Sequence, residues 1–296
     1  MKYNKFRFDE ITLNYDKKRI PLSAMERTKR QGAFRYFGAQ GVIDYVDDYI
    51  FDGKYLLIAE DGENLKSKRQ NIAQIVEGKF WVNNNAHIVQ CNDKCILEYL
   101  AYLINGKDVS GYITGSAQPK LSQANLNAME FDIPSIKEQQ DILSILLPIE
   151  QKIRINKEIN NNLEQQAQAI FDSMFPNITN GENTIGDTIT PKRGKGLLSK
   201  NAVFGNVPVV AGGLEPSTYH NTANTKAPVL AISASGANAG FVSLWNIPIW
   251  SSDSSFIDSS MTDDVYFWYV LLKKRQREIY DSQTGSAQPH IYPQHI

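Results

Sequence analysis

A stripe of apolar residues at heptad spacing dominates the middle of the chain. The positions between its members are mostly Lys, Glu, Gln and Asn. This pattern is typical of a helix that packs along one narrow seam against another helix. An amphipathic helix lying on a globular core is the alternative. The seam residues, at alternating steps of four and three, are Ile149, Ile153, Asn156, Asn160, Leu163, Ala167 and Ile170.

Two features modify this seam. Asn156 and Asn160 lie on the stripe itself. A buried Asn weakens helix packing but penalises wrong registers, so the pattern indicates a helix built to select its partner. Pro148 fits the first turn of a helix. The sequence therefore predicts a short helix from Ile136 to Leu147 and a longer one from Ile149 to Phe175.

The sequence before the seam can be aligned with the sequence after it. The hexapeptide Thr-Gly-Ser-Ala-Gln-Pro at residues 114–119 recurs identically at residues 284–289. Further correspondences follow in the same order, which indicates a duplication of a domain-sized unit rather than a short repeat. The matched segments are Trp81 with Trp250, 55–62 with 229–236, 36–41 with 209–213, 95–105 with 265–272, and Ile11-Thr12 with Ile189-Thr190.

Each copy mixes strand and helix signals. Residues 8–13 and 35–49 combine aromatic and β-branched residues with glycine turns, and residues 55–59 (YLLIA) read as a buried strand. Residues 95–105 have helical spacing. The predicted fold class is therefore α+β, with two duplicated mixed α/β domains joined by a long, coiled-coil-forming helical region.

Composition limits the classes of function. A chain of 296 residues suggests two domains, and 42% apolar residues supply enough material for their cores. A formal net charge of −1 excludes a uniformly basic nucleic-acid coat but not local basic patches. The two cysteines, Cys91 and Cys95, are too few for a disulfide framework or a zinc site. With no secretory signal and no apolar run of membrane length, we expect a cytoplasmic protein without a membrane partner.

The order of these features resembles the specificity (S) subunit of type I restriction-modification systems. The paired TGSAQP loops and the Pro-x-x-x-Glu-Gln start of the central helix carry this resemblance. It implies that two target recognition domains each read one half of a split, asymmetric site in double-stranded DNA. It also implies a helical spacer on which methyltransferase (modification) subunits dock, and motor-nuclease (restriction) subunits that join for cleavage. The implied domains are residues 1–134 and 184–296, with the spacer at 135–175 and a linker at 176–183.

The chain departs from the family pattern in one respect. The family has a distal helical region that pairs with the first, whereas this sequence stops at Ile296, shortly after its second TGSAQP loop. We therefore expect the seam to lack a partner within the chain, and self-association through the helical region is one way to supply it. A helix of about 27 residues would span roughly 40 Å, or about twelve base pairs of B-DNA.

Basic and amide-bearing loops are the candidates for DNA contact. Glycines between cations let both backbone and side chains approach phosphates, and Tyr, Asn and Gln can stack or pair with bases. An ordinary solvated charge run or a plain turn is the alternative for each segment. The candidates are Lys66, Lys68, Arg69 and Gln70 in the first copy, and Lys192, Arg193, Lys195, Tyr219, His220, Asn221, Ser235 and Asn238 in the second.

The repeated hexapeptides have a different role in this hypothesis. A joint between domain and helix must be the same in domains that read different sequences, so we favour a joint over a phosphate contact or a plain turn. The residues concerned are Thr114, Gly115, Ser116 and Gln118, with Thr284, Gly285, Ser286 and Gln288.

Catalytic motifs do not emerge from the sequence. We find no P-loop, no dinucleotide fingerprint, no Asn-Pro-Pro-aromatic tetrapeptide and no metal-ligand spacing among the four histidines. The sequence thus predicts a non-catalytic subunit with no catalytic residue, metal or cofactor. The alternative function is a coiled-coil protein-binding scaffold or assembly factor without sequence-specific DNA contact.

Overall fold

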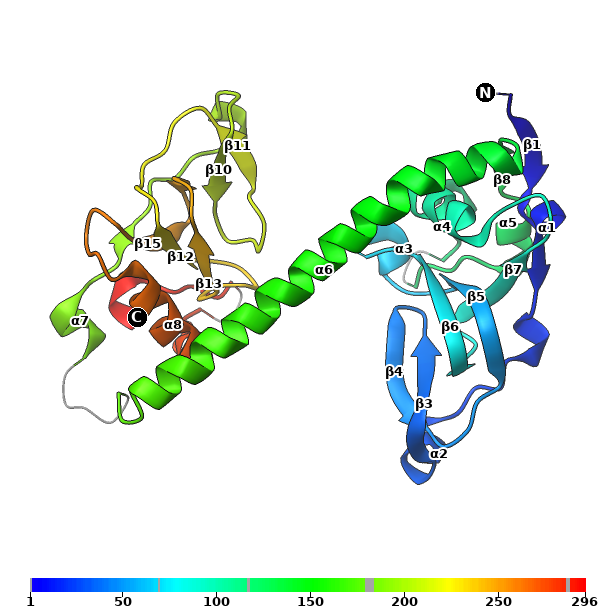
Figure 1. Cartoon of the computed structure of the whole chain (residues 1–296), viewed down its shortest axis with the longest axis horizontal. Helices are drawn as coiled ribbons and strands as arrows, with labels where there is room; N and C mark the ends of the chain where they lie inside the picture. Colours follow the sequence, from blue (N-terminus) through cyan, green and yellow to red (C-terminus); the bar gives the residue numbers. More distant parts are fainter. Residues whose placement is uncertain (1, 69, 116–117, 179–183, 286–287) are drawn as a thin grey trace. The chain divides into compact units, whose positions relative to one another are not determined.

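The structure, a computed structural model, describes residues 2–68, 70–115, 118–178, 184–285 and 288–296. It contains two compact units, residues 1–155 (unit 1) and 156–296 (unit 2). A single long helix, α6 (Ile136–Met174), contributes residues to both units, as Figure 1 shows in green. Each unit is described by itself below.

Unit 1 is a mixed sheet with helices packed against it. Its six-stranded sheet has the order β2-β7-β5-β6-β3-β4, and β1 pairs with β8 in a separate antiparallel ribbon. The elements before α6 are β1 (Asn4–Arg7), α1 (Phe8–Ile11), β2 (Thr12–Asn14), η1 (Asp16–Lys18), α2 (Ala24–Lys29), β3 (Gln31–Gly38), β4 (Gly41–Val46), β5 (Phe51–Ala59), α3 (Asn64–Ser67), β6 (Ala73–Val82), β7 (Ala86–Cys91), α4 (Leu97–Gly106), η2 (Ser110–Tyr112), α5 (Gln123–Asn127) and β8 (Glu130–Ile133).

The core of unit 1 forms on both faces of β5. Leu56 and Ile58 face the same apolar cluster as Leu100 of α4, whereas Leu57 joins a cluster with Phe37 on the opposite face. Alternation of side chains along a strand explains this division. The predicted strand over residues 55–59 and the predicted helix over 95–105 are confirmed as parts of β5 and as α4.

The predicted strand over residues 8–13 is wrong in its first half. Residues Phe8–Ile11 form the short helix α1, and only Thr12 begins a strand. The carboxylate of Glu10 accepts a hydrogen bond of 2.7 Å from the Arg7 backbone N–H, which caps the helix start. Phe8 and Ile11 are both fully buried. Their spacing of three residues suits one helix face better than one strand face.

Unit 2 combines the end of α6 with two smaller sheets. One sheet has the order β13-β12-β15-β9, and the other has the order β11-β10-β14. Its further elements are α7 (Ile185–Thr188), β9 (Lys192–Arg193), η3 (Ser199–Asn201), β10 (Val207–Val210), β11 (Thr218–His220), β12 (Val229–Ser233), β13 (Val242–Trp245), β14 (Trp250–Ser251), β15 (Ser254–Asp258), α8 (Val265–Lys274), α9 (Gln276–Asp281) and η4 (Pro293–His295).

The two units repeat one topology. β12 pairs antiparallel with β13 and β15, as β5 does with β6 and β7. Trp81 pairs in parallel with Tyr36 of β3, and Trp250 pairs in parallel with Val209 of β10. Helices α4 and α8 pack in the main apolar clusters of their units. The mixed α/β fold with a long helix is thus confirmed.

The predicted helix break at Pro148 is wrong. Pro148 lies inside the continuous helix α6. A proline removes the N–H that would bond to the carbonyl four residues earlier, here that of Ser144. Ser144 and Pro148 are both exposed, so water can solvate the freed carbonyl group. The helix therefore continues through this position at a cost that its neighbouring turns offset.

Helix α6 packs on the two units through residues outside the predicted seam. Leu143 is buried in the core of unit 1, and Phe171 is buried in the core of unit 2. The apolar seam residues are exposed instead, with exposed fractions of 53% for Ile149, 55% for Leu163 and 60% for Ile170. Within the described residues, the seam thus remains open to solvent.

Candidate nucleic-acid interface

The predicted DNA-binding residues of unit 1 lie on and just after α3. Lys66 is on α3, and Lys68 follows it in the left-handed region with φ +48°. The Lys68 ammonium donates a hydrogen bond of 3.0 Å to the Lys107 carbonyl and lies 3.8 Å from the Asp108 carboxylate. Arg69 lies outside the described residues.

This segment adjoins the first hexapeptide. Lys66, Lys68 and Gly115 line the same pocket, of about 500 Å³. Gln70 closes the loop, because its backbone N–H donates to the Asn64 side chain at 2.9 Å and its carbonyl accepts from the same amide. The structure thus brings two of the predicted cations together with the hexapeptide.

The predicted cations of unit 2 lie along β9 and the loop after it. Lys192 and Arg193 form β9, and Arg193 pairs with the Asp253 carboxylate at 2.7 Å. Ser235 donates a hydrogen bond to the same Asp253. Lys195 lies farther along, where its carbonyl accepts from the Trp250 indole at 2.8 Å. Predicted residues far apart in sequence, Arg193 and Ser235, therefore meet at one carboxylate.

The predicted triplet at residues 219–221 divides into exposed and buried positions. The side chain of Tyr219 is 52% exposed, whereas His220 is only 8% exposed. The His220 Nδ1 accepts a hydrogen bond of 3.0 Å from the Val203 N–H, and its ring packs edge-on against Trp250 at 5.0 Å. His220 thus holds the neighbouring loop in place and does not face solvent. Asn221 follows at the surface, and Asn238 donates to the Gly212 carbonyl at 3.5 Å.

The described residues of the two hexapeptides make matching contacts in the two units. Thr114 bridges to Lys120, and Thr284 bridges to His290. Gly115 and Gly285 both have positive φ, and a Cβ on Gly115 would lie 2.3 Å from the Gln118 carbonyl oxygen. Only glycine suits such a position. Gln118 and Gln288 are exposed, and Ser116 and Ser286 lie outside the described residues.

The prolines that end the two hexapeptides make contacts within their own units. The N–H of Gly62, after β5, donates to the Pro119 carbonyl at 3.1 Å, and the N–H of Gly236, after β12, donates to the Pro289 carbonyl at 3.0 Å. These contacts therefore tie the end of the central strand to the following segment.

The start of α6 is attached to unit 1 by Gln139. Its side chain is fully buried. The amide oxygen accepts from the Ile96 N–H at 2.8 Å, while the amide nitrogen donates to the carbonyls of Lys94 and Pro134 at 3.0 and 2.9 Å. Gln139 thus attaches the start of α6 to unit 1, and the role of the hexapeptide at the domain-to-helix joint stays a prediction.

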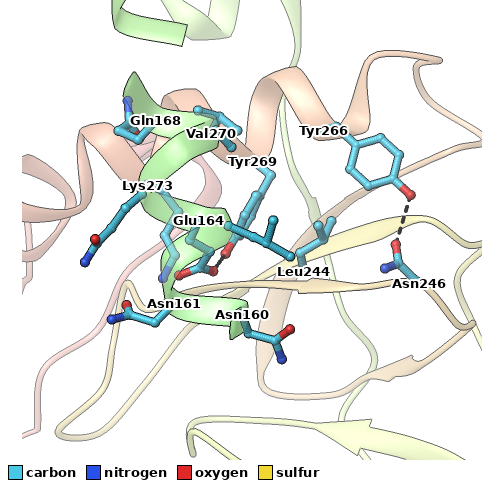
Figure 2. A pocket seen from close by; sticks show the side chains of 13 residues that line it. Asn160, Asn161, Glu164, Gln168, Leu244, Asn246, Tyr266, Tyr269, Val270 and Lys273 are labelled. Carbon is cyan, nitrogen blue, oxygen red and sulfur yellow. Dashed lines mark hydrogen bonds between the residues drawn. The ribbon is translucent and has the colours of Figure 1, made fainter. Parts of the chain in front are cut away.

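Each unit has a groove beside α6. The groove of unit 2 has a volume of about 720 Å³ and lies between α6 and the exposed face of α8 (Figure 2). The Tyr269 hydroxyl donates to the Glu164 carboxylate across it. In unit 1 a groove of about 400 Å³ lies beside α4, and the Tyr102 hydroxyl donates to Glu150 at 2.5 Å. Burial and the Glu150 carboxylate raise the pKa of Tyr102 to about 12.

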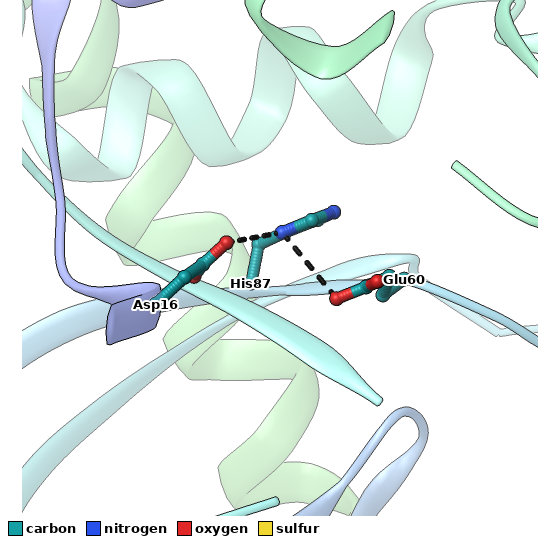
Figure 3. Close-up of side chains that lie close together, drawn as sticks. All are labelled: Asp16, Glu60 and His87. Carbon is teal, nitrogen blue, oxygen red and sulfur yellow. Dashed lines mark hydrogen bonds and ion pairs between the residues drawn. The ribbon is translucent and has the colours of Figure 1, made fainter. Parts of the chain in front are cut away.

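A buried polar cluster lies at the edge of the unit 1 sheet. Asp16, Glu60 and His87 converge there, as Figure 3 shows. The His87 ring contacts the Asp16 carboxylate at 2.6 Å through Nδ1 and the Leu121 carbonyl at 2.8 Å through Nε2. Burial opposes ionisation of Asp16, but hydrogen bonds from His87 and the Ile88 N–H, with the positive charge of Arg19, lower its pKa below the ordinary value.

Two cations complete this cluster. Arg19 pairs with Glu60 at 2.8 Å, and Lys120 pairs with the same carboxylate at 3.2 Å. Asp16, Glu60 and His87 are residue types that can bind a metal ion. However, the positive charges of Arg19 and Lys120 already balance the two carboxylates. Sequence spacing could not reveal this cluster, because its members come from four separate segments.

Comparisons with known proteins all point to one family. A family model described as the type I restriction modification DNA specificity domain matches residues 2–165. A putative type I restriction enzyme specificity subunit of Haemophilus influenzae, S.HindORF215P, is 31% identical over 138 residues, which are 47% of this chain and 35% of that protein. The HindI specificity subunit of the same organism is 31% identical over 131 residues, which are 42% of this chain and 25% of that protein.

A solved structure has a similar fold over most of the chain. The S subunit of a type I restriction-modification system from M. genitalium matches with a TM-score of 0.62 at 16% identity, covering 95% of this chain and 79% of that one. The matches to the curated relatives span about a third of their length or less. In the described part of the chain, no helix is long and apolar enough to cross a bilayer.

Proposed function

The chain belongs to the family of type I restriction modification DNA specificity proteins, and on this premise we propose that it recognises DNA sequence for a restriction-modification complex. In this proposal residues 1–134 and 184–296 are two recognition domains, each reading one half of a split, asymmetric site. Residues 135–175 are the spacer that sets the gap between the half-sites, and residues 176–183 are a linker.

The repetition of one fold in both units carries this proposal. The strand pairing around β5 and β12 is the same, and so are the hexapeptide contacts. The exposed side chains on this common framework differ between the units. Two readers with one geometry and different surfaces suit a target whose two halves have different sequences.

The partners follow from the same proposal. Methyltransferase subunits dock on the spacer, and motor-nuclease subunits join the assembly, so that both activities reside in partner subunits. The related specificity subunits of Haemophilus influenzae belong to type I restriction enzymes. The open seam of α6 offers a contact surface for an assembly of this kind.

Selection from a pool of random-sequence duplexes tests the proposal. The full chain, with and without its methyltransferase subunit, is mixed with the pool across a salt series, and the bound fraction is sequenced. We expect a motif in two parts with a fixed gap, and binding that weakens as salt rises. A continuous motif contradicts the two-reader model. Binding without sequence enrichment favours a scaffold function instead.

The exposed seam supports one finer proposal, self-association of two chains through α6. Ile149, Ile153 and Leu163 are each more than half exposed. An apolar stripe of this kind gains stability when a second helix covers it, and Asn156 and Asn160 can select the register. A second copy of the chain supplies the required complementary stripe.

Mass measurement in solution tests this association. We expect a dimer for the unaltered chain and a monomer after Ile153→Ser and Leu163→Ser together. Because both side chains are exposed, their replacement leaves the fold of each unit intact. The matched control is Gln151→Ala with Gln165→Ala, two exposed positions outside the seam. A monomeric unaltered chain contradicts the association.

A further inference from the structure

Each unit carries a two-stranded antiparallel ribbon at the edge of a sheet. The ribbons are β3–β4 in unit 1 and β10–β11 in unit 2. Tyr45 lies opposite Arg35 on the first ribbon, and Tyr219 lies opposite Pro208 on the second. Since the residue after Arg35 and the residue after Pro208 each pair with a tryptophan, the two tyrosines occupy equivalent positions.

The base of each ribbon has the same irregularity. Gly32 packs so closely against residues 46–47 that a Cβ would lie 2.4 Å from the Asp47 Cα. Gly205 has the same relation to the other ribbon, where a Cβ would lie 2.4 Å from the His220 carbonyl oxygen. The residues before these glycines, Gln31 and Phe204, are therefore structural equivalents.

Phe204 has no role in the core of unit 2. Its side chain is 93% exposed, more than any other large apolar residue in the described part of the chain. A protein that folds to bury apolar surface leaves a phenylalanine in this state only at a cost in solubility. At 93% exposure the Phe204 ring is available for contact with another molecule.

The loop that carries Phe204 is held on both sides. The Val203 N–H donates to the buried His220 ring, and Gly205 lies against the backbone of β11. The His220 ring packs on Trp250, whose indole donates to the Lys195 carbonyl. Three exposed residues thus connect to one aromatic pair, the buried His220 and the half-buried Trp250. They are Phe204, which follows Val203, Tyr219, which precedes His220, and Lys195, whose carbonyl accepts from Trp250.

This combination fits the major groove of DNA. The groove is about 12 Å wide and admits a two-stranded ribbon, and the C5-methyl group of thymine is the one apolar group that base pairs present there. Phenylalanine can contact that methyl group, and the exposed Lys195, whose carbonyl accepts from Trp250, can pair with a phosphate. We propose that Phe204 contacts a thymine methyl group in the half-site read by unit 2.

This inference rests on the proposed function and deepens it. In unit 1 the equivalent Gln31 is polar, and its amide nitrogen donates to the Arg27 carbonyl at 2.9 Å and to the Asp44 carboxylate at 3.2 Å. The same place on the framework therefore presents an apolar group in one unit and a polar network in the other. Tyr45 and Tyr219 occupy the same position in both units, whereas in this proposal the position of Gln31 and Phe204 distinguishes the half-sites.

The experiment combines a protein change with a DNA change. The motif of the unaltered chain is first obtained from the random duplex pool. Duplexes are then made in which each thymine of the motif is replaced by uracil, which lacks only the C5-methyl group. We expect the unaltered chain to lose about fourfold in affinity at one position of the unit 2 half-site, as for one buried methyl-sized group. Phe204→Ala should lower affinity for the unmodified duplex about tenfold and abolish the difference between thymine and uracil.

Tyr266→Ala is the matched control, because Tyr266 is an aromatic residue of unit 2 that is 53% exposed on α8. It should leave the affinities unchanged. One outcome overturns the inference alone: Phe204→Ala distinguishes thymine from uracil as the unaltered chain does, while the unaltered chain still selects a two-part motif. Phe204 is then assigned to a protein contact. A chain that enriches no sequence overturns both the inference and the proposed function. Thermal unfolding of each variant confirms that the fold is retained.

Discussion

At the scale of single residues, buried polar side chains connect the loops of unit 1 to its core. Gln139 satisfies one backbone N–H and two carbonyls at the start of α6. Asp16 accepts from His87 and from the Ile88 N–H. Removing either group leaves buried partners without hydrogen bonds, which costs more than the bond itself contributes.

Replacing Gln139 by Ala should lower the free energy of unfolding of unit 1 by about 1–3 kcal/mol, because the Ile96 N–H loses its acceptor and two carbonyls lose their donor. Urea unfolding of the full chain measures this loss. The neighbouring Gln140 is exposed, so Gln140→Ala should change stability by less than about 0.5 kcal/mol. Equal effects of the two changes would contradict the role of Gln139.

The Asp16 carboxylate should make stability depend on pH. Since its pKa is lowered in the folded state, its contribution is present above the ordinary value of 3.8 and is lost as pH falls through the lower folded value. Asp16→Asn should therefore destabilise the protein at neutral pH, and the difference from the unaltered chain should shrink below about pH 3.8. Thermal unfolding between pH 2.5 and 7 measures both midpoints. A difference independent of pH would exclude this linkage.

Sequence patterns located part of the candidate site at this scale. Lys195 and Tyr219 stand out by residue type; Tyr219 lies on β11 next to His220, and the Lys195 carbonyl accepts from Trp250. The burial of His220 was not predictable, because it depends on Trp250, which is distant in sequence. Phe204 was not among the residues singled out by the sequence, and its 93% exposure in the structure is what distinguishes it.

At the scale of elements, α6 shows how a long helix tolerates a proline. Pro148 lies on the exposed side with Ser144, so the missing hydrogen bond is lost where water can replace it. The prediction of two helices rested only on the preference of proline for the first turn of a helix. The helix has turns on both sides of Pro148, and their hydrogen bonds offset the one bond that the proline removes.

Replacing Pro148 by Ala should stabilise α6, because it restores an N–H to the helix interior. The expected gain in the free energy of unfolding is up to about 3 kcal/mol, the difference between proline and alanine inside a helix. Urea unfolding followed by circular dichroism measures it. Gln151→Ala, at an exposed position of the same helix, should change stability by a few tenths of a kcal/mol. A loss of stability in Pro148→Ala would show that the proline has a packing role.

At the scale of the whole molecule, the duplication determined how much could be predicted. Two identical hexapeptides and their flanking matches revealed two copies of one α/β unit, and the structure repeats the strand order around β5 and β12. The strand boundaries could not be derived from the sequence, nor could the division of the unit 2 strands between two sheets. Both depend on which strands pair rather than on local residue types.

The proposed spacer role predicts the effect of a longer helix. Duplicating residues 156–162 within α6 adds one heptad and keeps the phase of the seam. The gap between the two half-sites should grow by about three base pairs, since seven residues add about 10 Å. Selection from random duplexes measures the gap. A four-residue insertion shifts the seam out of phase and should weaken binding instead. An unchanged gap after the heptad insertion would contradict the spacer role.

The two hydrogen bonds from tyrosine to α6 have a consequence for how such chains can diversify. Tyr102 meets Glu150 and Tyr269 meets Glu164, and the two glutamates lie two heptads apart on the helix. Each unit therefore attaches to α6 through the same kind of hydrogen bond, from a tyrosine of α4 or α8 to a glutamate of α6. A related unit that carries a tyrosine at this helix position can therefore take the place of either one and form the same bond to α6.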